Sequence, residues 1–184
     1  MAHIKLKNEN LPGIVGLLDF SPKTARPLNE LAEVLLVGDS SLTRAEREII
    51  ASSVSYWNDC HFCHTVHAAT AVAHLKTGLF LIDDIKNNLR LTDVSPKLRA
   101  LLEIARKVQE GGKHVKAEHI TAARQKGATD KEIHDTVLIA AAFCMFNRYV
   151  DGLATWAPQP NEAYAGLGKA LAENGYAVTT PVEY

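Results

Sequence analysis

The chain has 184 residues, of which 47% are hydrophobic and 22% charged, a composition typical of a globular protein that can bury an ordinary core. Its formal net charge of -1 provides no basic surface of the kind that binds nucleic acid or anionic membranes. We therefore expect one domain over residues 1–184 that needs neither disulfides nor metals to hold it together, and a small-molecule or protein partner.

The N-terminal segment does not resemble an export signal. Lys5 and Lys7 precede an apolar stretch over residues 11–20, but proline and glycine interrupt this stretch and Asp19 lies near its end. No apolar run approaches the roughly 18 residues of a membrane-spanning helix. The sequence thus predicts a cytoplasmic protein, in which three cysteines indicate redox or metal chemistry more than a disulfide scaffold.

Helix-starting and helix-ending residues recur along the chain, whereas alternating β-branched stretches are nearly absent, so the sequence predicts an all-α fold. The expected helices, most of them bounded by capping residues, prolines or glycines, span about residues 28–37, 44–57, 60–77, 96–110, 116–127, 130–155 and 161–174. A short element near residues 82–89 and an extended or loosely held tail through Tyr184 complete the prediction.

Capping residues specify how two of these helices begin. Thr43 with Glu46 forms one capping box, and Thr129 with Glu132 forms a second. The connection between the helices expected over 44–57 and 60–77 is only about two residues long, so these helices must form a hairpin.

The second helix of this hairpin carries the most informative residues. At about 100° per residue, Cys60, Cys63 and His67 lie within one narrow stripe and can form one site. Two thiols three residues apart in a first helical turn can close a disulfide, and the free N–H groups there favour a thiolate. His67, one turn beyond Cys63, can take the thiol proton, and Glu48 of the preceding helix can fix the tautomer of His67.

Three other interpretations use the same residues. Residues 60–64 match the C-x-x-C-H pattern of c-type haem attachment, which generally requires export. Cys60, Cys63, His64 and His67 offer thiolate and imidazole ligands for zinc, although four ligands from one helix would hold little structure together. The cysteines can also be small buried apolar residues and His67 a core histidine, a reading that three residues on one stripe at a helix start disfavours.

The spacing of Glu48, Cys60, Cys63 and His67 resembles the alkylhydroperoxidase D signature within the carboxymuconolactone decarboxylase superfamily. The resemblance covers about residues 28–155 and leaves the tails over 1–27 and 156–184 outside it. Within it, residues 146–153 resemble the peroxidase-related branch.

This resemblance implies an all-helical bundle, built around the hairpin with the C-x-x-C motif, that assembles into trimers or hexamers. Separately, we expect no cofactor and no tightly bound haem or zinc. It implies a peroxidase in which Cys63 attacks the peroxide to become a sulfenic acid and Cys60 resolves this acid as a disulfide. His67 and Glu48 would relay protons, and a lipoylated or other dithiol partner would restore the thiols.

The sequence departs from the family pattern at Phe62, where well-studied members carry a histidine, which leaves open how the relay is wired and which peroxide is the substrate. The helix N-terminus favours a low pKa at Cys60, whereas His67 favours reaction at Cys63. We expect Cys63 to be the nucleophile and Cys60, at the mouth of the helix, to be reached by a reductant.

Alternative functions are a redox-sensing or zinc-binding module without turnover, or a decarboxylase of the same superfamily, against which the cysteine pair argues. Three residues further along the chain are expected to be structural. Cys144 lies in an apolar run and is predicted to be an inert core thiol, and Arg148 and Asp151 are predicted to pair across neighbouring turns.

Overall fold

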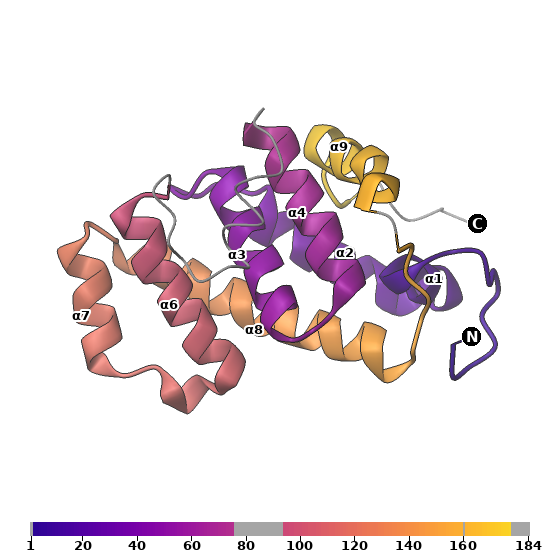
Figure 1. Ribbon diagram of the computed structural model, residues 1–184, viewed down its shortest axis with the longest axis horizontal. Helices are drawn as coiled ribbons and strands as arrows, with labels where there is room; N and C mark the ends of the chain where they lie inside the picture. The colour runs from indigo at the N-terminus through magenta and orange to yellow at the C-terminus, as the bar shows by residue number, and fades with distance from the viewer. Residues whose placement is uncertain (1, 76–93, 160, 178–184) are drawn as a thin grey trace.

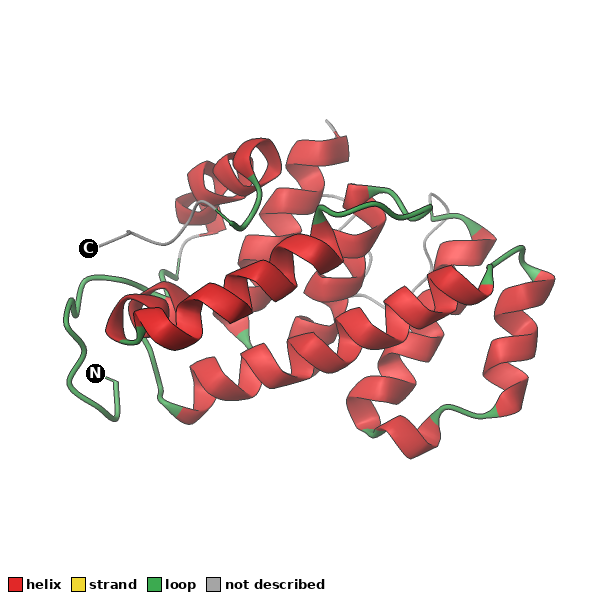
Figure 2. Ribbon diagram, turned by 180° about the vertical axis from the view of Figure 1, so that it is seen from behind, coloured by secondary structure: helices red, strands yellow, loops and turns green. Residues whose placement is uncertain are grey.

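The computed structural model describes residues 2–75, 94–159 and 161–177. Within these ranges every element of regular secondary structure is a helix, which confirms the predicted all-α class (Figures 1 and 2). The α-helices are α1 (Gly13–Phe20), α2 (Pro22–Leu36), α3 (Arg44–Trp57), α4 (His61–Leu75), α6 (Pro96–Glu110), α7 (Ala117–Gln125), α8 (Asp130–Gly152) and α9 (Ala165–Asn174). Two 3-10 helices, η1 (Gly112–His114) and η2 (Asn161–Tyr164), connect them.

The long helix α8 runs along the length of the molecule, with α7 at one end and α1 at the other (Figure 1). The hairpin of α3 and α4 occupies the middle, where α4 packs against α3 on one side and α9 on the other. Helix α3 also contacts α6 and α8, and all of its residues from 47 to 55 are buried. The hairpin is therefore the centre of the single cluster formed by the buried hydrophobic residues.

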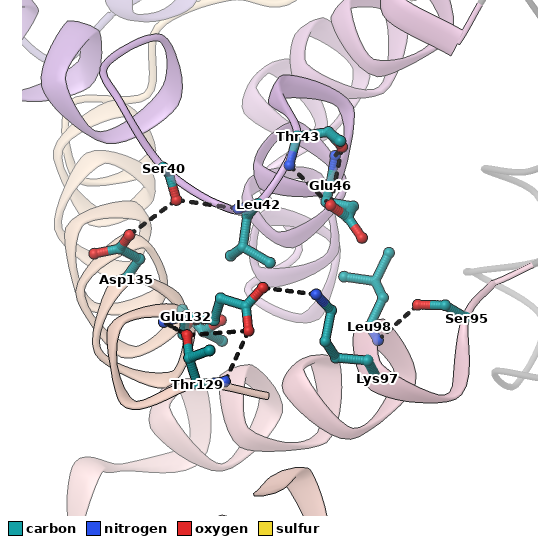
Figure 3. Close-up of polar contacts among 11 residues, drawn as sticks. Ser40, Leu42, Thr43, Glu46, Ser95, Lys97, Leu98, Thr129, Glu132 and Asp135 are labelled. Atoms are coloured by element: carbon teal, nitrogen blue, oxygen red, sulfur yellow. Dashed lines mark hydrogen bonds and ion pairs between the residues drawn. The ribbon is translucent and has the colours of Figure 1, made fainter. Parts of the chain in front are cut away.

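Both predicted capping boxes are present and can be followed in Figure 3. The Thr43 hydroxyl accepts the N–H of Glu46 at 3.2 Å, and the Glu46 carboxylate accepts the N–H of Thr43 at 2.8 Å. Thr129 and Glu132 repeat this pattern at the start of α8. The buried Glu132 carboxylate also accepts a hydrogen bond of 2.6 Å from Lys97, which joins α6 to α8.

Helix α2 begins at Pro22, so the prediction that it starts after Pro27 is wrong. Pro22 occupies the first helical turn, where a missing N–H costs nothing, whereas Pro27 lies inside the helix and removes one backbone hydrogen bond, to Lys23. The apolar face that α2 buries outweighs that loss. Helix α1, which follows Pro12 directly, was not predicted at all.

The remaining expected helices lie within a few residues of their predicted bounds. The largest differences are that α8 ends at Gly152 and that α9 begins at Ala165, after the 3-10 helix η2. The element expected near 82–89, the end of the helix predicted over 60–77 and the last part of the tail lie outside the described residues. Among the helices that are described, none is both long and apolar enough to cross a membrane.

Candidate active site

The turn between α3 and α4 is held in place by side-chain amides. Asp59 adopts a left-handed conformation with φ of 59°, which aspartate tolerates better than most residues. Beside it, the Asn58 amide donates to the Asn147 side chain at 2.8 Å and accepts from Gln109 at 3.0 Å. The turn is thereby tied to α6 and α8, and this fixes where α4 begins.

Cys60 immediately precedes α4 and Cys63 lies in its first turn, and both are free thiols with exposed fractions of 1% and 4%. The two cysteines lie close enough for Cys63 to be the largest influence on the pKa of Cys60. The contact with Cys63 and burial together raise the pKa of Cys60, so this residue stays a thiol at neutral pH. The expectations that Cys60 has a depressed pKa and an open position at the helix mouth are both wrong, because burial and neighbouring negative groups outweigh the helix terminus.

Asp151, near the end of α8, interacts with Cys60 and not with Arg148. Its carboxylate lies close enough to the Cys60 thiol to raise the pKa of Cys60, and the thiol in turn lowers the pKa of Asp151. Asp151 is exposed, but partial desolvation of its carboxylate still raises its pKa, and the negative charge of Asp59 adds to this effect. Arg148 donates instead to the backbone oxygen of Cys144 at 2.8 Å. The predicted Arg148–Asp151 pair is therefore wrong, because a spacing of one turn permits an ion pair but does not require one.

Glu48 and His67 face each other across the hairpin. The Nδ1 atom of His67 lies 2.7 Å from Oε2 of Glu48, and Glu48 is only 1% exposed. The second carboxylate oxygen, Oε1, accepts a hydrogen bond of 2.7 Å from the hydroxyl of Tyr176. A buried carboxylate that accepts two hydrogen bonds in this way can hold an imidazole in one orientation and tautomer.

Tyr176 is the residue of this group that sequence reasoning missed. It follows α9 in the tail that was expected to be extended or loosely held, yet its side chain is buried and its ring stacks against that of His67. The expectation of a loose tail is wrong at this position. The sequence offers no local signal for it, since nothing near Tyr176 specifies a contact with a helix more than 100 residues earlier.

A mostly apolar cavity of about 270 Å³ opens between α1, α2, α4, α8 and α9. Its polar side chains are those of Asn29, Cys63, His67 and Tyr176, whereas Cys60 does not line it. Most of the surrounding wall is aliphatic or aromatic and includes Ile14, Leu18, Leu28, Phe143, Leu167 and Leu171. A molecule in this cavity therefore meets the sulfur of Cys63, and not that of Cys60.

Phe62 forms part of the cavity wall at the position where the sequence departs from the family pattern. Its ring packs against Gly13, where a Cβ atom would lie 2.2 Å from the ring, so the close approach of α1 requires glycine. The backbone of Gly13 is also left-handed, with φ of 52°. Phe62 therefore supplies apolar surface and cannot take part in proton transfer.

The histidines on either side of Phe62 point away from the cavity. His61 makes a hydrogen bond of 3.2 Å with the backbone oxygen of Pro158, and Nδ1 of His64 lies 3.1 Å from the backbone oxygen of Ser52. Among the described residues, His67 is thus the one histidine that lines the cavity. The described residues also contain no group of three or more His, Cys, Asp or Glu side chains that could hold a metal ion. The four zinc ligands of the alternative interpretation, Cys60, Cys63, His64 and His67, therefore do not converge on one point.

Comparison with protein families matches residues 22–78 and 82–157 to the carboxymuconolactone decarboxylase family. No curated protein matches the chain.

Several solved structures share the fold. A peroxidase-related protein from Silicibacter sp. TM1040 is 27% identical with a TM-score of 0.73, and the match covers 84% of this chain and 79% of that one. A peroxidase-related protein from Ralstonia eutropha JMP134, described as an alkylhydroperoxidase AhpD core, is 28% identical with a TM-score of 0.75 over 86% and 82% of the two chains. A protein of unknown function from Agrobacterium tumefaciens, 19% identical with a TM-score of 0.69 over 80% and 99%, supports the fold alone.

Proposed function

Because the chain belongs to the carboxymuconolactone decarboxylase family, we propose that it is a thiol-dependent peroxidase of the alkylhydroperoxidase D kind that reduces organic hydroperoxides. The observation that carries the proposal is that Cys63 and His67 line one apolar cavity while His67 is hydrogen-bonded to Glu48. The two structures at 27% and 28% identity are both described as peroxidase-related, which supports the same class of reaction.

In the first step, His67 takes the proton of Cys63, and Glu48 balances the positive charge of the imidazolium. The Cys63 thiolate attacks the terminal oxygen of the hydroperoxide, so that an S–O bond forms and the O–O bond breaks. The sulfur is oxidised by two electrons to a sulfenic acid, and the peroxide is reduced to an alcohol. The departing alkoxide takes the proton held by His67.

In the second step, Cys60 attacks the Cys63 sulfenic acid. An S–S bond forms, the S–O bond breaks, and water leaves. Because the pKa of Cys60 is raised by its contact with Cys63 and by burial, its proton must be removed for this step. The Asp151 carboxylate, which interacts with the Cys60 thiol, is the proposed acceptor, and the proton passes on to the departing hydroxide.

A dithiol then reduces the disulfide and restores both thiols. The exposed fractions of 1% and 4% at Cys60 and Cys63 favour a slender reductant, such as a lipoyl group, over the broad surface of a thioredoxin-like protein.

The walls of the cavity favour an uncharged substrate with an apolar tail. No lysine or arginine of the described chain lines it, so a carboxylate substrate of the kind a decarboxylase takes would find no counter-ion there. An organic hydroperoxide can place its tail against the apolar wall and its peroxide oxygens at Cys63 and His67.

Self-association is a further part of the proposal. Leu138 and Met145 lie two turns apart on α8 and are 40% and 43% exposed, which leaves apolar surface that a second copy can cover. We propose a trimer or hexamer. Light scattering at micromolar concentration tests this, and a mass near 20.1 kDa, that of one chain, would contradict it.

Steady-state peroxide consumption tests the proposed activity. The purified chain is supplied with cumene hydroperoxide or hydrogen peroxide and with dithiothreitol, dihydrolipoamide or glutathione as electron donor. We expect repeated turnover with the dithiols and faster consumption of cumene hydroperoxide. Consumption of a single equivalent with every donor would identify a redox sensor instead, and about one zinc per chain purified without added metal would identify a metal-binding module.

A further inference from the structure

The C-terminal segment contributes a buried hydroxyl to the Glu48–His67 pair. The Tyr176 hydroxyl lies 2.7 Å from Oε1 of Glu48 and 3.2 Å from Nδ1 of His67. Its ring centroid lies 5.9 Å from that of His67, and the two ring planes are inclined by only 16°. Tyr176 also lines the cavity into which Cys63 faces. It is therefore in direct contact with both members of the pair.

The donors and acceptors in this group can be assigned. Burial and the adjacent Glu48 carboxylate raise the pKa of Tyr176 well above its usual value, so the phenol keeps its proton and donates it. Oε1 of Glu48 accepts that hydrogen bond, which leaves Oε2 for Nδ1 of His67. If Nδ1 carries a hydrogen, as a carboxylate partner requires, Nε2 is the nitrogen that can accept a proton.

The backbone around Tyr176 is fixed independently of its side chain. Oε2 of Glu33, on α2, accepts the N–H of Tyr176 at 2.6 Å and that of Ala177 at 3.2 Å. The preceding Gly175 has φ of 74°, a left-handed conformation that favours glycine, and a Cβ atom there would lie 2.5 Å from the same carboxylate and force it to move.

Helix α9, which leads to this segment, is seated equally closely on α4. A Cβ atom at Gly168 would lie 2.7 Å from the backbone of Ala69 and 2.8 Å from that of Thr70. The two helices therefore touch through their backbones, one turn beyond His67. The position of the Tyr176 hydroxyl is set from both sides, by α9 on α4 and by Glu33 on α2.

We infer that Tyr176 is a positioning residue of this site: its hydroxyl holds Glu48 so that the carboxylate accepts the Nδ1 hydrogen of His67 and leaves Nε2 to take the proton of Cys63. The inference rests on the proposed peroxidase function for its purpose, but not for its test. The reactivity of Cys63 would then depend on the segment around Tyr176, which follows α9.

Tyr176→Phe tests this inference, because it keeps the buried ring and removes only the hydroxyl. The first readout is the pH dependence of Cys63 alkylation by iodoacetamide, located by mass spectrometry in a Cys144→Ser background. We expect the midpoint to move to higher pH and alkylation at neutral pH to slow by about tenfold, the size of effect that one hydrogen bond to a charged group produces. Tyr149→Phe serves as the control, because it removes the hydroxyl of a half-buried tyrosine on a different element, α8. It should leave the pH dependence of Cys63 alkylation unchanged.

The second readout is the tautomer of His67, observed by ¹⁵N NMR of the imidazole. Wild-type protein is expected to show hydrogen on Nδ1, and Tyr176→Phe a mixture of tautomers. An unchanged alkylation midpoint together with an unchanged tautomer in Tyr176→Phe would overturn the inference and leave Tyr176 a packing residue. Should this variant fail to fold, Glu33→Ala, which releases the backbone of Tyr176, decides by the same two readouts. Neither readout requires turnover, so a wild-type protein that fails to consume peroxide refutes the proposed function and not this inference.

Discussion

Oε2 of Glu48 lies 2.7 Å from Nδ1 of His67, although the two residues are 19 positions apart and belong to different helices. Glu48→Gln keeps the size of the side chain but removes the charge that balances the imidazolium. We expect the first reaction with hydroperoxide to slow by about 100-fold or more, as loss of a general base or its orienting partner does.

Stopped-flow measurement of thiol loss after one equivalent of cumene hydroperoxide gives this rate. Glu46→Gln, on the same helix, is the matched control, because glutamine can also serve in a capping box. Equal rates for the two variants would mean that Glu48 has no part in activating Cys63.

Asp151→Asn separates the second step from the first. Asparagine can still lie beside the Cys60 thiol, but it is a far weaker proton acceptor than the aspartate carboxylate that it replaces. The sulfenic acid on Cys63 is expected to form at the wild-type rate and to persist about tenfold longer or more before the disulfide closes. Trapping with dimedone at successive times measures its lifetime, and a wild-type lifetime would exclude Asp151 from the step.

The same substitution has a predictable effect on stability. Because partial desolvation raises the pKa of the exposed Asp151 carboxylate, the folded protein binds this proton slightly more tightly than the unfolded chain does. Binding of this proton stabilises the folded state fully at pH values below the pKa of Asp151 in the unfolded chain. This stabilisation is lost as the pH rises through the pKa of Asp151 in the folded protein. At pH 7 the ionised carboxylate therefore lowers the free energy of unfolding, which an uncharged asparagine does not. We expect Asp151→Asn to melt at least as high as wild type at pH 7, with the difference shrinking towards pH 4. A melting temperature below that of wild type at pH 7 would contradict this.

The sequence was most informative where physical signals are local. Thr43 with Glu46 and Thr129 with Glu132 place two helix starts to the residue, because a capping box depends only on side chains three positions apart. The family resemblance, which also rests on spacing, is matched by the family comparison over most of the chain.

Contacts between distant segments were not predictable in the same way. Tyr176 reaches Glu48 across 128 positions, and Asp151 reaches Cys60 from the far end of α8. Such contacts depend on how helices pack, for which the sequence carries no local signal. The predicted start of α2 after Pro27 was wrong for a related reason. A helix tolerates an internal proline when the apolar face that it buries is large enough, and this depends on packing.

Filling the cavity is expected to alter substrate preference. Val15, on α1, lines the cavity, and Val15→Trp would occupy much of its roughly 270 Å³. We expect the Michaelis constant for cumene hydroperoxide to rise about tenfold while that for hydrogen peroxide changes little, since the small molecule still reaches Cys63.

Val34→Trp, at a position that is 69% exposed on α2, provides the control. If Val15→Trp affects both peroxides equally, the cavity is not where the organic tail binds.

The division of labour between the two sulfurs is the central claim, and mass spectrometry after one equivalent of cumene hydroperoxide tests it most directly. In Cys60→Ser, we expect a dimedone-trapped sulfenic acid on Cys63 that forms at the wild-type rate and over-oxidises with excess peroxide. In Cys63→Ser, we expect no reaction at the remaining site cysteine, because Cys60 is buried away from the cavity and its pKa is raised by its surroundings. Cys144→Ser should behave as wild type. A sulfenic acid trapped on Cys60 in Cys63→Ser at the wild-type rate would contradict the account and make Cys60 the nucleophile.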